Sequence, residues 1–171
     1  MYKHFVLVGP KSDPAGVRSR DIVAALARLR ASESQTFVSR GDRSGTHAAE
    51  LRYWTTAWIE TPKTTMAHYE EGGCGMGLAL NIASAKNAYA LADRGTWLSF
   101  QSRGELAILV EGDRRLFNQY GVIVVDPSKH PHLKRELAQA VADWVVSPAG
   151  QETIASYKIG GQQLFFSDAK P

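Results

Sequence analysis

Short apolar runs that alternate with helix-patterned segments most constrain how this chain can fold. Residues 5–9 have the pattern of a buried strand closed by Gly9 and Pro10, and apolar side chains in residues 19–32 then fall at helical spacing. The alternation continues, with strands expected at residues 36–38, 88–91, 106–110 and 121–125 and helices at residues 44–58, 64–71, 78–85, 133–144 and from residue 147 onward. Strands that alternate with helices predict an α/β fold with a mostly parallel sheet.

Helical spacing also predicts which side chains face the core. The expected core faces of the first three long helices are Ile22, Ala25, Leu26 and Leu29, then His47, Leu51, Trp54 and Trp58, then Leu78, Ile82 and Ala85.

Composition excludes several classes of protein. The 171 residues are 44% hydrophobic and 22% charged, which is typical of a globular domain. The net charge of +3 comes from scattered residues without a basic stripe, so nucleic acid is not an expected partner. Cys74 is the one cysteine and makes no internal disulfide, and no apolar run reaches the roughly 18–20 residues that span a bilayer.

Three glycine-punctuated turns, each rich in hydrogen-bond donors, precede expected helices. The first turn reads Ser-Arg-Gly-Asp-Arg-Ser-Gly-Thr-His at residues 39–47, the second Gly-Gly-Cys-Gly-Met-Gly at residues 72–77 and the third Asp-Arg-Gly-Thr-Trp at residues 93–97. A helix start presents unpaired backbone amides and the positive end of the helix dipole, and glycine lets a ligand approach that backbone closely. In parallel sheets, ligands lie beyond the carboxyl ends of strands, where the first and third turns are expected. The turns therefore predict a site for a small anion.

The first turn carries the strongest signal. Ser39, Ser44 and Thr46 supply hydroxyls, and Arg40 and Arg43 supply positive charge. These groups donate hydrogen bonds, which suits a ligand that only accepts them. A helix cap alone would need only Ser44, which leaves the two arginines and the other hydroxyls unexplained, but on these residues alone capping stays open as the alternative to anion binding.

The other two turns leave alternatives open. The second turn lacks the Lys-Ser/Thr ending of a nucleotide-binding loop, and a close packing turn between strand and helix explains its glycines equally well. Cys74 is interpreted as a small buried hydrophobe. In the third turn, Arg94 either faces a ligand or pairs with Asp93 or another carboxylate.

No catalytic pattern is present. The sequence contains no Gly-x-Ser-x-Gly elbow, no Cys-x-x-Cys pair and no convincing pair of carboxylates. His130 and His132 are expected at the exposed start of a helix rather than on a metal. The sequence therefore predicts a binding protein with no enzymatic activity, cofactor or metal.

Several segments, taken together, carry a family resemblance over essentially the whole chain. They are residues 5–17, 39–47, 75–77, 82–84 and 88–97, followed by Ser-Pro-Ala-Gly-Gln at residues 147–151 and Tyr157. These segments resemble the tungstate-binding subunit of tungstate ABC transporters, and the string at residues 39–47 is the most specific of them.

The resemblance implies a periplasmic-binding-protein type II fold, in which two α/β lobes are joined by hinge strands. Residues 1–10 would form a hinge strand, and residues 11–118 a complete lobe with a mixed, mostly parallel sheet and the anion-binding turns. Residues 119–171 would supply the second hinge strand, at residues 121–125, and the C-terminal helices of the other lobe.

The resemblance also implies a ligand, contacts and partners. The main contacts would be Ser39, Arg40, Ser44, Gly45 and Thr46, with backbone amides from Gly75 and Met76 and a further contact from Arg94. The ligand would be a tetrahedral oxyanion, tungstate first and molybdate next, delivered to a membrane permease from a periplasmic or membrane-anchored extracytoplasmic position.

Two other functions stay open at this stage. One is a phosphate- or sulfate-type anion binder, because Asp42 or Asp93 could accept a hydrogen bond from the proton that phosphate retains. The other is a ligand-sensing regulatory domain of the same fold.

Family members carry a further segment before the strand at residues 5–9, which builds most of one lobe and supplies an anion loop of its own. Since this sequence does not contain that segment, we expect weakened or absent oxyanion affinity. We also expect an uncovered apolar face on the C-terminal helices, with self-association as a consequence.

Overall fold

The computed structural model describes residues 1–60 and 62–169, and the chain forms two structural units. The larger unit is His4–Phe117, and the smaller one combines Met1–Lys3 with the chain from Asn118 onward. The chain therefore passes between the units twice, once within the first strand and once at residues 117–118. The hinge role of these segments stays a prediction.

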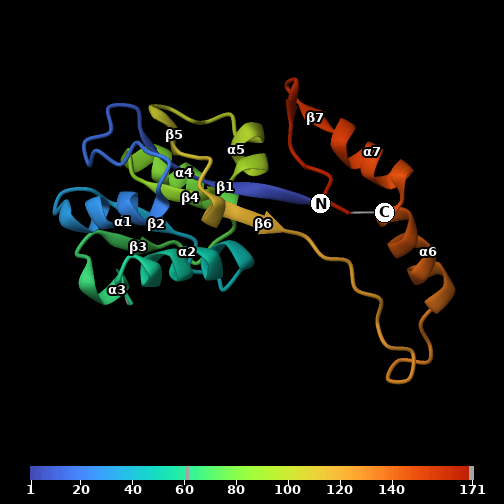
Figure 1. The fold of residues 1–171 in the computed structure, drawn as a ribbon. Helices are drawn as coiled ribbons and strands as arrows, with labels where there is room; N and C mark the ends of the chain where they lie inside the picture. Colours follow the sequence, from blue (N-terminus) through green and yellow to red (C-terminus); the bar gives the residue numbers. More distant parts are fainter. Residues whose placement is uncertain (61, 170–171) are drawn as a thin grey trace. The chain divides into compact units, whose positions relative to one another are not determined.

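The helices and strands follow one another as an alternating series (Figure 1). In chain order they are β1 (Tyr2–Pro10), α1 (Ile22–Ala31), β2 (Phe37–Ser39), α2 (Gly45–Thr56), α3 (Pro62–Thr65), β3 (Tyr69–Glu71), α4 (Met76–Lys86), β4 (Ala90–Asp93), α5 (Arg94–Ser99), β5 (Leu106–Val110), the 3-10 helix η1 (Arg114–Leu116), β6 (Phe117–Gln119), α6 (Arg135–Val146), α7 (Pro148–Ser156), β7 (Lys158–Ile159) and β8 (Gln162–Gln163).

Strand β1 runs through the middle of the main sheet. It pairs antiparallel with β4, where Leu7 lies opposite Leu91, and antiparallel with β5 on its other side, and β6 also pairs with it. Strand β2 pairs in parallel with β3 and, through the bridge from Phe37 to Tyr89, in parallel with the chain entering β4. Strands β2, β3, β4 and β5 thus share one direction and β1 opposes them, which confirms the expected mixed, mostly parallel sheet.

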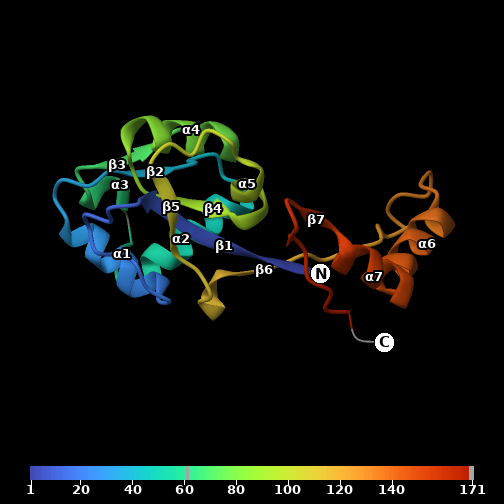
Figure 2. The ribbon, with the colours of Figure 1, turned by 90° about the horizontal axis from the view of Figure 1, so that it is seen from above.

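Helices cover both faces of this sheet. Because side chains alternate along a strand, successive residues of β1 belong to opposite cores. Phe5 and Leu7 of β1 belong to the core on one face, with buried residues of α1 and α2. Val6 and Val8 belong to the core on the other face, with buried residues of α4 and α5. Figure 2 shows the sheet between α4 on one side and α1 and α2 on the other.

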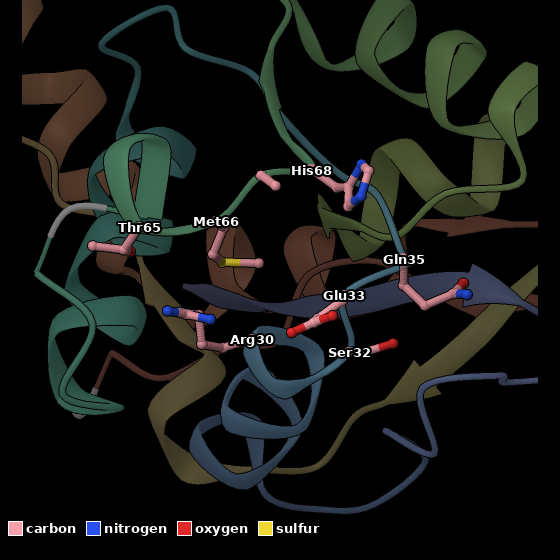
Figure 3. A pocket seen from close by; sticks show the side chains of 8 residues that line it. Arg30, Ser32, Glu33, Gln35, Thr65, Met66 and His68 are labelled. Carbon is pink, nitrogen blue, oxygen red and sulfur yellow. The ribbon is translucent and has the colours of Figure 1, made fainter.

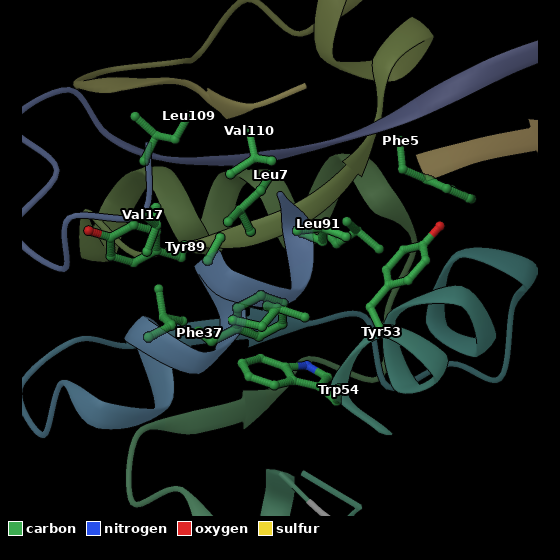
Figure 4. Packing of buried hydrophobic residues seen from close by; sticks show 14 of the residues in the cluster. Phe5, Leu7, Val17, Phe37, Tyr53, Trp54, Tyr89, Leu91, Leu109 and Val110 are labelled. Atoms are coloured by element: carbon green, nitrogen blue, oxygen red, sulfur yellow. The ribbon is translucent and has the colours of Figure 1, made fainter. Parts of the chain in front are cut away.

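Aromatic packing fills the first of these cores (Figure 4). The rings of Phe37 and Tyr69 stack with centroids 5.7 Å apart, and Trp54 meets Phe37 edge-on at 5.2 Å. Tyr89 is fully buried beside β1, and a Cβ atom built on Gly9 would lie 2.4 Å from its ring. The close approach of β1 to this ring explains why position 9 is glycine.

Helical periodicity predicted α1 correctly. The expected face of Ile22, Ala25, Leu26 and Leu29 is the buried one. The helix begins after Asp21, whose carboxylate accepts hydrogen bonds from the backbone amides of Val23 and Ala24.

The predicted core faces of α2 and α4 are only partly right: His47 and Trp54 are buried and Ile82 is partly buried against the core, but the other apolar residues predicted there are not. Leu51 and Trp58 are exposed, Trp58 to 94%, while Glu50 and Tyr53 are buried. On α4 the buried residues are Met76, Ala79, Leu80 and Ala83, and Leu78 is exposed. Counting apolar residues misplaced part of each face, because a buried glutamate in α2 and several alanines in α4 belong to the buried faces.

Three predicted segments also need correction. Residues 64–71 contain the last two residues of α3 and the strand β3 rather than one helix, and strand β4 begins two residues later than expected. Residues 121–125 are not a strand, and Val122, Ile123 and Val125 are exposed. Their β-branched side chains favour a strand, but a strand needs a hydrogen-bonding neighbour, and this segment has none among the residues that the structure describes.

The smaller unit contains the two predicted C-terminal helices. Ser147 caps α7 by accepting a hydrogen bond from the amide of Gly150, and Pro148 occupies the first helical turn. Helix α6 buries none of its residues, and Leu137, Val141 and Trp144 are each at least half exposed. The expected uncovered apolar face is therefore present in this structure.

Candidate functional site

The first turn follows directly from β2, whose last residue is Ser39, and leads into α2. Gly41 and Arg43 both have positive φ, at 59° and 60°, which lets the chain reverse sharply within a few residues. Ser44 caps α2 through a hydrogen bond of 3.3 Å from the amide of His47 to its hydroxyl. Gly45 and Thr46 are the first two residues of the helix, so their amides have no carbonyl partner within it.

Arg40 lies within this turn and is held by Asp42. Its guanidinium pairs with the Asp42 carboxylate, which also accepts a hydrogen bond of 3.1 Å from the amide of Ser44. Hydrogen bonds from Ser44 and Arg40 lower the pKa of Asp42 to about 2, so this carboxyl is ionised at neutral pH. The Nε atom of Arg40 is buried and has no hydrogen-bond partner among the described residues. A buried donor without a partner is costly unless a ligand or water satisfies it.

Ser39 is completely buried and contacts a second buried carboxyl, that of Glu50 on α2. Its hydroxyl donates to Glu50 over 2.9 Å, and the hydroxyl of Tyr69 donates to the other carboxyl oxygen over 2.6 Å. Burial raises the pKa of Glu50 to about 7, although these two hydrogen bonds act in the opposite direction. Glu50 was not predicted from the sequence. The available signal was its spacing, since it lies three residues after His47 and four before Trp54 on one face of a helix.

The second turn lies against the first. The amide of Gly72 donates to the carbonyl of Ser39 over 2.9 Å, and the amide of Cys74 donates to the carbonyl of Arg40 over 3.0 Å. A Cβ atom on Gly41 would lie 2.8 Å from the Cβ of Glu71, so glycine permits this approach. Gly41, one of the glycines of the predicted anion-binding turn, thus also serves the packing of the two turns.

The second turn leads into α4 with Gly75 as the capping residue. No side chain caps this helix, so none is hydrogen bonded to its first amides. Met76 is buried and is the first residue of α4. The predicted contribution from Gly75 and Met76 was through backbone amides, and their place at a helix start is compatible with it.

The third turn joins β4 to α5. Asp93 caps α5 by accepting a hydrogen bond of 3.1 Å from the amide of Thr96. Arg94 lies 3.8 Å from Glu111, as its Nε atom approaches that carboxylate. Because β2 and the chain entering β4 run in parallel, the first and third turns both follow the carboxyl ends of neighbouring strands.

The other candidate features of the chain lie elsewhere. A hollow of about 320 Å³ between the end of α1 and the chain after α3 is lined by residues that include Arg30, Glu33 and His68 but by none of the predicted contacts. Figure 3 shows the side chains that line it. In residues 1–60 and 62–169, no three side chains of His, Cys, Asp or Glu are grouped to hold a metal ion. Within the same ranges, every helix is too short or too polar to cross a membrane.

Comparison with known proteins now gives the family. The model of the PBP superfamily domain matches residues 1–149. The chain belongs to the PBP superfamily. This membership agrees with the α/β architecture described above.

Its named relatives are binding proteins. The chain is 44% identical over 160 residues to the tungstate-binding protein TupA of Peptoclostridium acidaminophilum, covering 92% of this chain and 54% of that protein. It is also 44% identical over 174 residues to an ABC transporter anion-binding protein of Haloferax volcanii described as putative, covering 99% of this chain and 50% of the relative. The solved structure of tungstate-binding protein TupA from Desulfovibrio alaskensis matches with a TM-score of 0.87 and 41% identity, over 99% of this chain and 69% of that one.

This PBP-superfamily chain spans about half the length of the two curated relatives described above. The resemblance found in the sequence, to tungstate-binding subunits, is confirmed by these relatives. The predicted contact residues stay a prediction.

Proposed function

We propose that this chain carries the anion-binding turns of a solute-binding protein that captures a tetrahedral oxyanion for an ABC importer. Tungstate is the first choice of ligand and molybdate the next. The partner would be the membrane permease of the transporter, and the protein would act outside the cytoplasm without catalysing a reaction.

The observation that carries this proposal is the junction of the first and second turns. Two backbone hydrogen bonds, from Gly72 and Cys74 to Ser39 and Arg40, hold together the segments that begin α2 and α4. Both helix starts supply backbone amides, and Arg40 adds a buried Nε donor that lacks a partner among the described residues. Donors gathered at helix starts suit an oxyanion, which carries only acceptors. The tungstate-binding relatives support the choice of ion.

The donor set also bears on the phosphate alternative. Asp42 is already paired with Arg40 and Ser44, and Asp93 already caps α5. A protonated phosphate would compete with these contacts for an acceptor, whereas tungstate and molybdate need none. The arrangement thus favours a fully deprotonated dianion.

Calorimetric titration of the protein with tungstate, molybdate, sulfate and phosphate tests the proposal. We expect tungstate and molybdate to bind more tightly than the other two anions. Replacing Arg40 with alanine should weaken tungstate binding by about 10- to 100-fold, because a hydrogen bond to a charged group contributes about 1.5–3 kcal/mol. The matched control is Arg114→Ala, which removes an exposed arginine of η1 and should leave the affinity within about twofold.

Two outcomes would contradict the proposal. An unchanged affinity in the Arg40→Ala variant would overturn the assignment of the site. The absence of heat with all four anions would overturn oxyanion capture by this chain.

A further inference from the structure

A buried carboxyl lies directly behind the first turn, and the oxyanion-binding function does not use it. The side chain of Glu50 is 2% exposed and reaches Ser39, the residue that immediately precedes Arg40. An acidic group is unexpected beside a site for a dianion, since it repels the ligand.

The hydrogen bonds of Ser39 define the direction of its hydroxyl proton. The Oγ atom donates to Glu50 over 2.9 Å and accepts a hydrogen bond of 3.2 Å from the amide of Gly41. A serine hydroxyl has one proton, so the proton given to Glu50 is not available to another acceptor. While Glu50 is ionised and accepts from Ser39, the Ser39 hydroxyl has no proton left to donate to an oxyanion.

Tyr69 fixes the carboxyl in this arrangement. Its hydroxyl donates to the second oxygen of Glu50 over 2.6 Å, and its ring is stacked on Phe37 in the neighbouring strand. Glu50 thus joins α2, β2 and β3 through two hydrogen bonds. The carboxyl is therefore held in place by residues of two strands and does not rotate freely.

We propose that Glu50 is a positioning residue of the oxyanion site, which sets whether the hydroxyl of Ser39 points toward Glu50 or is free to donate to the anion. This inference rests on the proposed function. When Glu50 carries a proton on the oxygen facing Ser39, that O–H donates a hydrogen bond to Oγ, and the serine hydroxyl, which keeps its own proton, becomes free to donate to another acceptor. Protonation therefore adds a donor to the site and removes a negative charge in the same step.

The groups around Glu50 are mixed in type. From β2 it meets Ser39, from β3 Tyr69 and the more distant carboxylate of Glu71, and from α2 the side chain of Trp54. His47 lies one helical turn before it, and Arg40 follows Ser39 along the chain. Burial raises the pKa of Glu50 to about 7, and the Glu71 carboxylate acts in the same direction. The change in Ser39 is thus expected near neutral pH, where tungstate is a dianion.

The test compares tungstate affinity in the wild type, in Glu50→Gln and in Glu70→Gln between pH 6 and 8.5. Glutamine keeps an oxygen for Tyr69 and places an amide donor opposite Ser39, which mimics the protonated carboxyl. The control removes a half-exposed carboxylate of β3 that pairs with Lys86 and does not touch Ser39. A residue that only supports the fold would not change the pH profile.

We expect the wild-type Kd to rise about tenfold across this range. The Glu50→Gln variant should keep the low Kd at every pH, and Glu70→Gln should follow the wild type. Weaker binding in Glu50→Gln, or a profile like that of the wild type, would overturn the inference.

A second measurement needs no ligand and separates this inference from the proposed function. In carbon-13 NMR, the Cβ signal of Ser39 should titrate together with the Glu50 carboxyl carbon, and this titration should be absent in Glu50→Gln. If tungstate does not bind the wild type, the proposed function fails and the NMR titration alone decides the role of Glu50. A Ser39 signal that is independent of pH in the wild type would overturn that role.

Discussion

Replacing Glu50 with glutamine should stabilise the larger unit at pH 8 and have little effect at pH 5. The physical reason is the cost of an ionised carboxyl in a buried position, where the side chain is 2% exposed. Glutamine has the same shape, keeps an acceptor for Tyr69 and carries no charge. The comparison therefore isolates the ionisation of one side chain.

The magnitude follows from the pKa of Glu50, which burial raises from 4.5 to about 7. Because the folded pKa is the higher one, the unfolded chain loses its proton first as the pH rises. The free energy of unfolding therefore falls between about pH 4.5 and pH 7 and stays lowered above that window. The difference between the folded and unfolded pKa of Glu50 corresponds to a loss of about 3 kcal/mol in the free energy of unfolding, at about 1.4 kcal/mol per pH unit.

Urea unfolding followed by tryptophan fluorescence measures the effect at pH 5, 6, 7 and 8. At pH 8 the free energy of unfolding of the Glu50→Gln variant should be about 3 kcal/mol higher than that of the wild type. This difference should shrink steadily toward pH 5. The Glu70→Gln variant is the control, and its difference from the wild type should be within about 1 kcal/mol at every pH because that carboxylate is half exposed. A Glu50→Gln variant that is less stable than the wild type at pH 8 would refute the reasoning.

Two further predictions concern the framework of the site. Gly9→Ala should lower the free energy of unfolding by about 1–3 kcal/mol, since the new Cβ would lie 2.4 Å from the ring of Tyr89, whose hydroxyl is held by the amide of Ala15; an unchanged urea midpoint would contradict this. Ser44→Ala should cost about 0.5–2 kcal/mol through loss of the cap on α2, while Ser44→Gly should cost only a few tenths; equal losses in the two variants, measured by thermal unfolding, would argue against capping.

Local pattern was enough to predict much of the larger unit. Residues 106–110 match β5 residue for residue, and the periodicity of α1 identified its buried face, because both segments have one dominant apolar pattern. The glycines and hydroxyls of the first turn likewise placed a helix start after Ser44. These features depend on residues that are neighbours in the chain.

The rest depended on partners that are distant in the chain. Residues 121–125 have strong strand propensity and still form no strand, because propensity does not supply a hydrogen-bonding neighbour. The pairing of the first and second turns joins Ser39 to Gly72 and Arg40 to Cys74 across more than thirty residues, and no local pattern announces it.

The sequence by itself determined the alternation of elements, the three donor-rich turns and, through its resemblance, the family. Only the tertiary structure showed that Glu50, a charged residue on a helix, is buried behind Ser39 and hydrogen bonded to Tyr69. A glutamate is normally expected on an exposed face, because burying a carboxyl is costly unless partners satisfy it. Those partners come from β2 and β3, so the position of this residue was decided when the strands and α2 packed together.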